Sequence, residues 1–526
     1  MKTPRRRIAV IATSMLLGLA LPAETAFAKA PTAMPAPKAS STPKTSSTAK
    51  TSSTAKTTAS KSVAMTAAST VPTLASRLTA VKTAKSINYY PSMAGWSKMW
   101  TSWNPTRFDA DLTKASALGA TNVRAIIFPN TFGYPYPKPT YVAMLKQFVD
   151  LAGARGMTVR FTLFDWWDGY SDVSGSTSWA NTILAPYKND SRVISVELQN
   201  EFNPSDAAAV GWAKKMVPFM RTSFPTMPVT FSVDGGIGHT GMAKIKTALV
   251  ASPVDYYDFH FYGNSERALA MIRRAQATVA PAPVVIGEVG LNTLQNTEGE
   301  QAAFLARVYQ AAALAGVQAV SPWTLTDFAQ GAIPESAVSR LVAQYSYGLY
   351  RLDGTAKPAA AVVKAAWAGT AMPTNLLDPS FEMAAGQTSW RAYLPELGAG
   401  VKTQTAARTG KWSVSFTNTG KSAAGTPSFR VAPINAVWGG QKWHGEAWVR
   451  GNAVTGTNQI ALSWFDINDK WLGGVSSASL RAGTTNWTKL AVDGVAPVGS
   501  ASMQIHLKSG ENSGTVWFDD VVVTAS

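Results

Sequence analysis

The sequence predicts an α/β domain, a (β/α)8 TIM barrel over residues 86–369, followed by an all-β sandwich over residues 375–526. Three observations lead to this. Short apolar runs alternate with amphipathic helical patterns in the first segment, which is typical of parallel α/β folds. The second segment has short alternating β patterns separated by Gly, Asn and Thr turns. Pro373 marks the change from one composition to the other.

Eight β-rich runs are expected to form the barrel strands. They are residues 87–90, 122–128, 158–164, 193–200, 229–233, 257–261, 284–287 and 319–323. Eight strands with intervening helices in roughly 280 residues fit a closed barrel. A doubly wound open sheet is the alternative, but a Gly-rich phosphate-binding turn should then follow an early strand, and the sequence has none.

Helix boundaries support this reading. Asn104 is a good N-cap for a helix with Pro105 at its first position, and Gly119 is expected to end that helix. Asn203-Pro204 resembles the same start signal, so we expect a long helix from there to about Ser223. Further helices are predicted over residues 139–155, 298–315 and 358–367.

The first 28 residues are typical of a secretory signal peptide. Arg5-Arg6-Arg7 precedes an apolar run from Ile8 to Pro22, and Ala26-Phe27-Ala28 fits a cleavage site. We therefore expect a secreted, extracellular bacterial protein that begins at Lys29. No apolar run reaches the roughly eighteen residues of a membrane span, so no membrane span is expected.

Residues 29–85 are expected to form a disordered linker rich in Ala, Ser, Thr and Lys. The formal net charge of the chain is +17, but residues 29–86 contain nine Lys or Arg and no acidic residue. The charge is therefore concentrated outside the folded domains, and we expect no nucleic-acid partner. A plain spacer is the simpler interpretation of this segment. The alternative is salt-sensitive contact with anionic envelope polymers.

The sequence contains no Cys, which excludes disulfides, thiolate metal sites and Cys nucleophiles. It contains 18 Trp, 15 Tyr and 20 Phe, more than cores alone require. In secreted proteins, aromatic rings often serve as platforms for the apolar faces of sugars.

Two predicted strands end in a glutamate. The run 193–200 leads into Glu201, and the run 284–287 leads into Glu288. Side chains alternate along a strand, so Glu197 and Glu201 are expected on one side and Asn200 on the other. Because barrel sites lie at the C-terminal strand ends, the two glutamates are expected to meet there.

Other strand ends in the barrel also carry polar or aromatic residues. They are Arg124, Asp165-Trp166-Trp167, His260, Tyr262 and Trp323. Taken singly, the tryptophans and His260 could be ordinary core residues. Either Arg124 or Arg160 could instead pair with Glu197, since a carboxylate inside a barrel needs a cation.

With their motifs in order, residues 86–369 resemble the retaining glycoside hydrolases of the family 5 cellulase and mannanase type. The motifs are Asn122-Val123-Arg124, Leu198-Gln199-Asn200-Glu201, His260-Phe261-Tyr262, Ile286-Gly287-Glu288, Ser321-Pro322-Trp323 and the stretch 347–354. Two features depart from the family pattern. Many members have a His after the third strand, where this chain has Asp165-Trp166, and Phe202 replaces a common Pro.

The resemblance implies that Glu201 is the general acid/base and Glu288 the nucleophile. Arg124 would keep Glu288 ionised and Tyr262 would hydrogen-bond it. The remaining implied substrate-binding residues are Asn200, at the sugar 2-hydroxyl, and His260, Trp323 and Trp166 along the subsite.

The chemistry supports this division of roles. Cleavage with retention needs one carboxylate nucleophile and one protonated carboxyl about 5–5.5 Å apart, in environments that separate their pKa values. We therefore predict a monomeric β-glycosidase that hydrolyses a β-linked polysaccharide or oligosaccharide, glucan or mannan, without a catalytic cofactor. A transglycosylase and a non-catalytic carbohydrate-binding or envelope protein are the alternatives.

The segment 375–524 resembles the carbohydrate-binding sandwiches appended to bacterial polysaccharidases, through Asn375–Glu382 and Val516–Val521. Those modules commonly hold a structural calcium ion, so the resemblance makes Glu382 and Asp520 candidate ligands. A plain charged strand end is the alternative, because two carboxylates do not supply the six to eight oxygens of a calcium site. Candidate sugar platforms are Trp438, Trp443, Trp464 and Trp471, of which two could be core.

Overall fold

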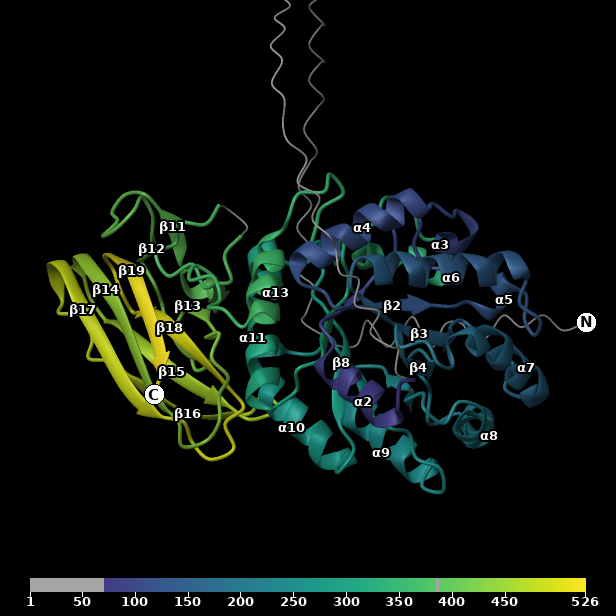
Figure 1. The fold of residues 1–526 in the computed structure, drawn as a ribbon. Coiled ribbons are helices and arrows are strands. Elements are labelled where there is room, and N and C mark those ends of the chain that lie inside the picture. Colours follow the sequence, from purple (N-terminus) through teal and green to yellow (C-terminus); the bar gives the residue numbers. More distant parts are fainter. Residues whose placement is uncertain (1–70, 385–386) are drawn as a thin grey trace, which may run out of the picture. The chain divides into compact units, whose positions relative to one another are not determined.

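The computed structural model describes residues 71–384 and 387–526. The predicted signal peptide and most of the predicted linker lie outside this range. Figure 1 shows strands accompanied by helices in the purple-to-green part of the chain, and strands with few helices in the yellow-green part. These are the two predicted classes of fold, α/β followed by all-β.

Nine short strands form the barrel. They are β1 Ser86–Asn88, β2 Asn122–Ile126, β3 Thr158–Phe164, β4 Val193–Gln199, β5 Val229–Thr230, β6 Ser232–Val233, β7 Tyr257–Phe261, β8 Val284–Val289 and β9 Val320–Pro322. All neighbours pair in parallel and in chain order, β1 to β5 in one sheet and β6 to β9 in the other. The predicted fifth strand is thus divided at Phe231.

The ring closes between the last strand and the first. The Asn88 carbonyl accepts hydrogen bonds from the Leu325 backbone N–H at 3.2 Å and from the Thr324 hydroxyl at 2.8 Å. The residues that continue β9 therefore meet the end of β1. The predicted TIM barrel is confirmed, and its strand ends converge on one face.

Helices follow most of the strands. They are α3 Lys98–Thr101, α4 Pro105–Leu118, α5 Pro129–Phe132, α6 Pro139–Ala154, α7 Val173–Leu184, α8 Ala207–Ser223, α9 Gly238–Ala248, α10 Ala268–Val279, α11 Glu298–Leu314, α12 Ser336–Ser339 and α13 Pro358–Ala368, with 3-10 turns at Ala185–Tyr187, Ser265–Arg267 and Val342–Ser346. The Asn104 side chain caps α4 by accepting from the Arg107 N–H, and Gly119 ends that helix at φ +107°. Both are as predicted.

The predicted start of the long helix at Asn203-Pro204 is wrong by about one turn. Asp206 is the N-cap of α8, and its side chain accepts from the N–H groups of Ala208 and Ala209. The Asn203 side chain instead accepts from the Ser205 N–H, two residues on, which forms a turn. Both side chains are good caps, and the sequence pattern did not distinguish them.

The C-terminal end of the predicted linker is also wrong, because residues 74–83 form α2 Leu74–Thr83. Thr73 and Ser76 make a capping box at its start. The Arg77 guanidinium is buried and donates to the carbonyls of Tyr187, Lys188 and Asp190. Val81 and Ala84 pack with a small cluster from the N-terminal strand ends, which contains Ile194, Tyr256, Val285 and Ala319. The sequence of residues 74–83 has low hydrophobicity, so it did not indicate this helix, which covers the N-terminal ends of the barrel strands.

The C-terminal part is a pair of antiparallel five-stranded sheets, as an all-β sandwich requires. The strands are β10 Arg391–Tyr393, β11 Val401–Thr403, β12 Ser413–Thr417, β13 Ser428–Val431, β14 Lys442–Val454, β15 Thr457–Phe465, β16 Trp471–Ser476, β17 Gly483–Val495, β18 Ser502–Gly510 and β19 Thr515–Ala525, with a 3-10 turn at Pro395–Leu397. Their orders are β10-β13-β18-β15-β16 and β11-β12-β19-β14-β17.

The four candidate platform tryptophans divide into two pairs. Trp443 and Trp464 are 2% and 1% exposed and belong to the sandwich core. Trp438 and Trp471 are 38% and 60% exposed, so only these two offer a ring face to solvent.

Candidate active site

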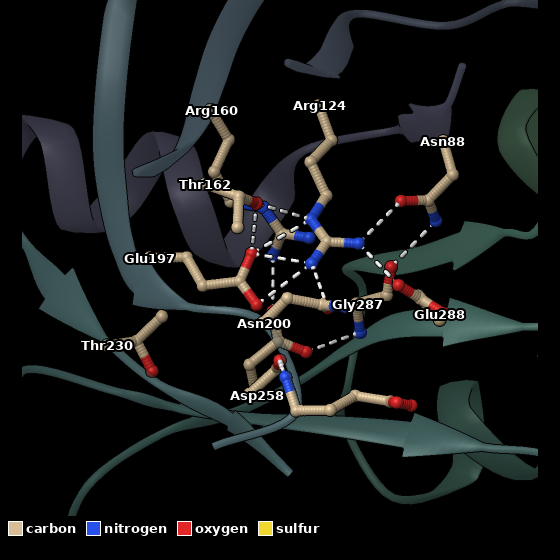
Figure 2. Close-up of polar contacts among 12 residues, drawn as sticks. Asn88, Arg124, Arg160, Thr162, Glu197, Asn200, Thr230, Asp258, Gly287 and Glu288 are labelled. Atoms are coloured by element: carbon tan, nitrogen blue, oxygen red, sulfur yellow. Dashed lines mark hydrogen bonds and ion pairs between the residues drawn. The ribbon is translucent and has the colours of Figure 1, made fainter. Parts of the chain in front are cut away.

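Arg124, in the middle of β2, is the centre of a buried polar network (Figure 2). Its Nε and Nη2 donate to the two oxygens of Glu197 at 2.8 and 2.9 Å, and Nε also contacts the Thr162 hydroxyl. Its Nη1 donates to Glu288 and to Asn88, the latter at 3.1 Å. Both alternatives left open by the sequence therefore hold at once, because Arg124 pairs with Glu197 and with Glu288.

Glu288 in β8 is held from two sides. One carboxylate oxygen accepts from Arg124, and the other accepts from the Tyr262 hydroxyl at 2.7 Å. A guanidinium and a phenol donor both stabilise the ionised form of a carboxyl group. Glu288 thus contacts both of its predicted partners, and their role in catalysis stays a prediction.

Asn200 and Glu201 lie beyond the last residue of β4, and the predicted alternation fails at this point. Asn200 was expected on the opposite side from Glu197, yet its Oδ1 accepts from Arg124 Nη2 at 2.7 Å. Glu201 has φ +45°, outside the extended region. The strand period of two ends at Gln199, so both side chains reach the site.

His260 in β7 lies between the two glutamates. Its Nδ1 is 3.2 Å from an oxygen of Glu201 and 3.5 Å from an oxygen of Glu288. Burial alone would lower its pKa, but the charges of Glu288 and Glu201 and the hydrogen bond to Glu201 raise the pKa of His260 to about 9. The imidazole is therefore a buried cation at neutral pH. The family resemblance implies only that His260 lines the subsite, so its position between the two acids was not predicted.

The environments of the two glutamates differ in the direction that acid catalysis needs. Burial raises the pKa of Glu201, and the charges of Glu288 and Asp234 add to the effect against the opposing influence of His260. Glu201 therefore tends toward the protonated form, whereas Glu288 accepts hydrogen bonds from the Arg124 guanidinium and the Tyr262 hydroxyl. One oxygen of each, together with His260, lies within 4.8 Å of the others. A separation of this order suits direct attack rather than a water between the carboxylates.

The family comparison agrees with this geometry. Residues 84–328 match the family model described as cellulase, glycosyl hydrolase family 5. This range runs from the start of β1 to beyond β9 and contains both glutamates. Residues 84–328 form a glycosyl hydrolase family 5 domain. No curated protein sequence matches the chain.

The chain is also similar to several solved structures. An exo-β-1,4-mannosidase, Op5Man5, from an Opitutaceae bacterium is 21% identical, with a TM-score of 0.45 over 54% of this chain and 59% of its own. A GH5_18 protein from Streptomyces cattleya, solved with GlcNAc, is 20% identical, with a TM-score of 0.46 over 56% and 82%. A GH5_18 protein from Bifidobacterium longum is 19% identical, with a TM-score of 0.47 over 55% and 81%. The chain spans less than two thirds of the length of Op5Man5.

The other predicted substrate-binding residues of the family 5 domain are placed as follows. Asn200 is half-buried and uses its oxygen for Arg124, which leaves its amide N–H groups for a ligand. Trp166 is half-buried at the end of β3, with φ +52°. Trp323 is mostly buried, packs edge-on against Trp96 and donates to the Gln344 side chain at 3.2 Å. Trp323 therefore packs mainly against other residues of the barrel.

A second ion pair beneath the glutamates was missed. Arg160 Nη1 donates to Asp258 at 2.6 Å, and the other Asp258 oxygen accepts from the Gly287 N–H at 2.8 Å. Asp258 and His260 are two residues apart in β7, and His260 pairs with Glu288 of the neighbouring strand β8. Two polar residues at a spacing of two in an apolar run were the signal that could have revealed this pair.

Two groups of residues have the spacing of metal ligands within the described part of the chain. They are Glu197, Asp258 and His260, and Glu201, His260 and Glu288. Both need a neutral imidazole, because a protonated ring has no lone pair to give to a metal. The raised pKa of His260 therefore favours a proton at this position over a metal ion.

The two predicted calcium ligands are engaged otherwise. One Glu382 oxygen accepts from the N–H groups of Lys411 and Trp412, both at 2.8 Å. Asp520 accepts from the Ser380 hydroxyl at 2.8 Å and from the Arg408 guanidinium at 2.6 Å. These donors fit carboxylates without a metal, so the calcium site gains no support and stays a prediction.

Among the described helices, none is long and apolar enough to cross a membrane.

Proposed function

We propose that the protein is a secreted retaining β-glycosidase that hydrolyses a β-linked polysaccharide or oligosaccharide by double displacement. The observation that carries this proposal is the pairing of Glu201 and Glu288. One oxygen of each lies within 4.8 Å of the other, burial favours a proton on Glu201, and Glu288 is held by Arg124 and Tyr262.

In the first step, Glu288 attacks the anomeric carbon while Glu201 gives its proton to the leaving glycosidic oxygen. The bond from carbon to that oxygen breaks, and a covalent glycosyl ester of Glu288 forms. In the second step, Glu201 removes a proton from water, and the resulting attack releases the sugar and restores both carboxyl groups.

The neighbouring hydrogen-bond donors have separate tasks in this scheme. Arg124 and Tyr262 orient the attacking oxygen pair of Glu288 through the contacts described above. His260 donates a hydrogen bond to Glu201 and carries a positive charge between the two acids. That charge allows two carboxyl groups to share a buried site at moderate energetic cost.

The substrate class proposed is glucan or mannan, on the strength of the cellulase family model over residues 84–328. The signal-like residues 1–28 support export, and the basic segment 29–70 supports a spacer or a contact with anionic envelope polymers. The exposed Trp438 and Trp471 support sugar binding by the sandwich.

A substrate panel with analysis of product configuration tests the proposal. The full chain is incubated with β-glucans, mannans and xylans, product sizes are measured, and the first-formed anomer is recorded by NMR before mutarotation. We expect cleavage of a glucan or mannan with the β-anomer formed first. Formation of the α-anomer first would exclude double displacement, and binding without cleavage of any polymer would favour a non-catalytic role.

A further inference from the structure

Asp165 is a buried carboxyl group without a partner at the mouth of the barrel. It directly follows β3 and is only 5% exposed. Within the described residues, its side chain makes no hydrogen bond and no ion pair. Polar atoms that lack a partner and are completely sealed from solvent include neither Asp165 oxygen. The small exposed area of Asp165 therefore includes its carboxyl group. The carboxyl group therefore keeps some contact with solvent.

The nearest cation of the network has no donor left for Asp165. The five N–H groups of Arg124 are directed at Glu197, Glu288, Asn88, Asn200 and Thr162. Arg124 therefore acts on Asp165 only through its charge. Burial raises the pKa of Asp165 to about 7, with Glu197, Glu201 and Glu288 adding to the rise and Arg124 opposing it. Asp165 directly follows Phe164, which pairs with Gln199 of β4, so Asp165 lies beside the strand end that leads to Glu201.

Hydrogen bonds hold the backbone on both sides of Asp165, so the position of its side chain is defined. The Asp165 N–H donates to the Ile127 carbonyl at 3.3 Å. Two residues on, the Trp167 carbonyl accepts from the Gln199 amide at 3.0 Å. Between them, Trp166 adopts φ +52°, a conformation that a bulky side chain rarely takes. Contacts to β2 and β4 thus hold the turn that carries the carboxyl group.

Tyr90 carries a second polar group that lacks a hydrogen-bond partner. The Tyr90 hydroxyl is buried without a partner, and among the charges that act on its pKa the largest is Asp165. The Tyr90 ring stacks on Trp96 at 5.1 Å and meets Trp323 edge-on at 6.0 Å. The Tyr90 hydroxyl is sealed from solvent, so Asp165 is the one of these two groups that a ligand can reach, beside this aromatic wall.

We propose that Asp165 binds hydroxyl groups of the sugar ring that lies between Glu201 and Glu288. This inference rests on the proposed function and adds its selectivity. A carboxylate accepts from two neighbouring hydroxyls, which supply the donors that the protein does not. The site then takes a neutral sugar with free hydroxyls at that position. It disfavours a uronic acid there, because a second carboxylate would be repelled in the same buried space.

Deoxy substrates test this assignment. Aryl β-glycosides of glucose and mannose, as mono- and disaccharides, are prepared together with their 2-, 3-, 4- and 6-deoxy forms. With the full-length wild type, we expect kcat/KM to fall about 10- to 100-fold when the hydroxyl that faces Asp165 is removed, the usual effect of a charge-assisted hydrogen bond. Asp165→Ala should show a similar fall on the parent sugar and no further fall on that deoxy sugar.

Two controls separate recognition from a structural effect. Asp168→Asn changes an exposed carboxyl on the same turn and should keep the wild-type deoxy pattern. The urea midpoint of Asp165→Asn at pH 8 should not fall below that of the wild type, because a buried carboxylate without a partner is removed.

The outcomes are distinguishable. If the wild type cleaves the parent glycosides but each deoxy penalty is the same in Asp165→Ala, the inference about Asp165 is overturned and the proposed function stands. If the wild type cleaves none of the glycosides, the proposed function is overturned, and this inference with it.

Discussion

His260 offers a direct test of the electrostatics of the site. Its pKa is raised from 6.5 to about 9, and this difference corresponds to about 3 kcal/mol of interaction with the glutamates. The folded state holds the proton more tightly than the unfolded state. The stabilisation is therefore fully present below pH 6.5 and is lost as the pH rises through 9.

Urea unfolding of the wild type and of His260→Gln measures this loss. From pH 6 to pH 10, the free energy of unfolding of the wild type should fall by about 3 kcal/mol relative to the variant. The matched control is His444→Gln, because His444 is an exposed residue whose pKa is raised by Asp493 and Glu446. Exposed pairs contribute little, so we expect a relative change below about 1 kcal/mol there.

NMR gives a second measurement that does not depend on a variant that folds well. The sequence contains only four His, so their imidazole signals can be followed individually. His506 should remain neutral above pH 5, because burial lowers its pKa to about 3. His260 should stay protonated at pH 7.5. A His260 signal that titrates at or below pH 6.5, together with parallel urea curves, would refute this description of the site.

Four further predictions concern the segments outside the site. Removal of residues 1–70 should leave kcat/KM on a soluble substrate unchanged, whereas removal of residues 1–85 should lower the urea midpoint, since α2 and the buried Arg77 are lost; lost turnover in the first case, or an unchanged midpoint in the second, would contradict this. Trp464→Ala should lower the free energy of unfolding by about 3–5 kcal/mol, because its ring is in the sandwich core. Trp471→Ala should change stability by less than about 0.5 kcal/mol and weaken retention on insoluble polymer, and unaltered retention would exclude Trp471 as a platform.

The parts of the barrel that were predictable depend on local pattern. Strands β3 and β7 have the predicted bounds, because a run of apolar residues with clear turns on both sides leaves little freedom. Glu201 and Glu288 were recognised because parallel strands deliver their last residues to one face. Arg124 and Tyr262 were assigned to Glu288 through the family resemblance.

The features that were not predicted depend on contacts between residues far apart in the sequence, or on local patterns that favour more than one structure. Nothing in the order of residues shows that His260 lies between two acids, so its charge was not predictable. The alternation failed at Asn200 because the strand ends at Gln199, and the residue after Asn200, Glu201, is left-handed, which a strand pattern does not reveal. Helix α2 was concealed by Ser, Thr and Lys, since its stability comes from Arg77 and from packing under the barrel rather than from its own propensity.

The sandwich illustrates a similar limit. All four candidate tryptophans lie in or beside β strands, and alternation alone did not say which side of each strand faces the other sheet. Trp443 and Trp464 face inward and Trp471 outward. The pairing of strands from distant parts of the chain decides this, and β14 pairs with both β17 and β19.

The division of roles between Glu288 and Glu201 is the central claim, and the configuration of azide products tests it most directly. Glu288→Gly should lose turnover, and azide should enter from the opposite face to give an inverted α-glycosyl azide. Glu201→Ala should still form the glycosyl ester from activated aryl glycosides and then stall. Azide should rescue it to a β-glycosyl azide, with a loss on activated substrates smaller than the roughly 10²–10⁴-fold expected where protonation is needed. NMR of the two azides decides the matter: α from Glu288→Gly and β from Glu201→Ala support the assignment, and the opposite pair would reverse it.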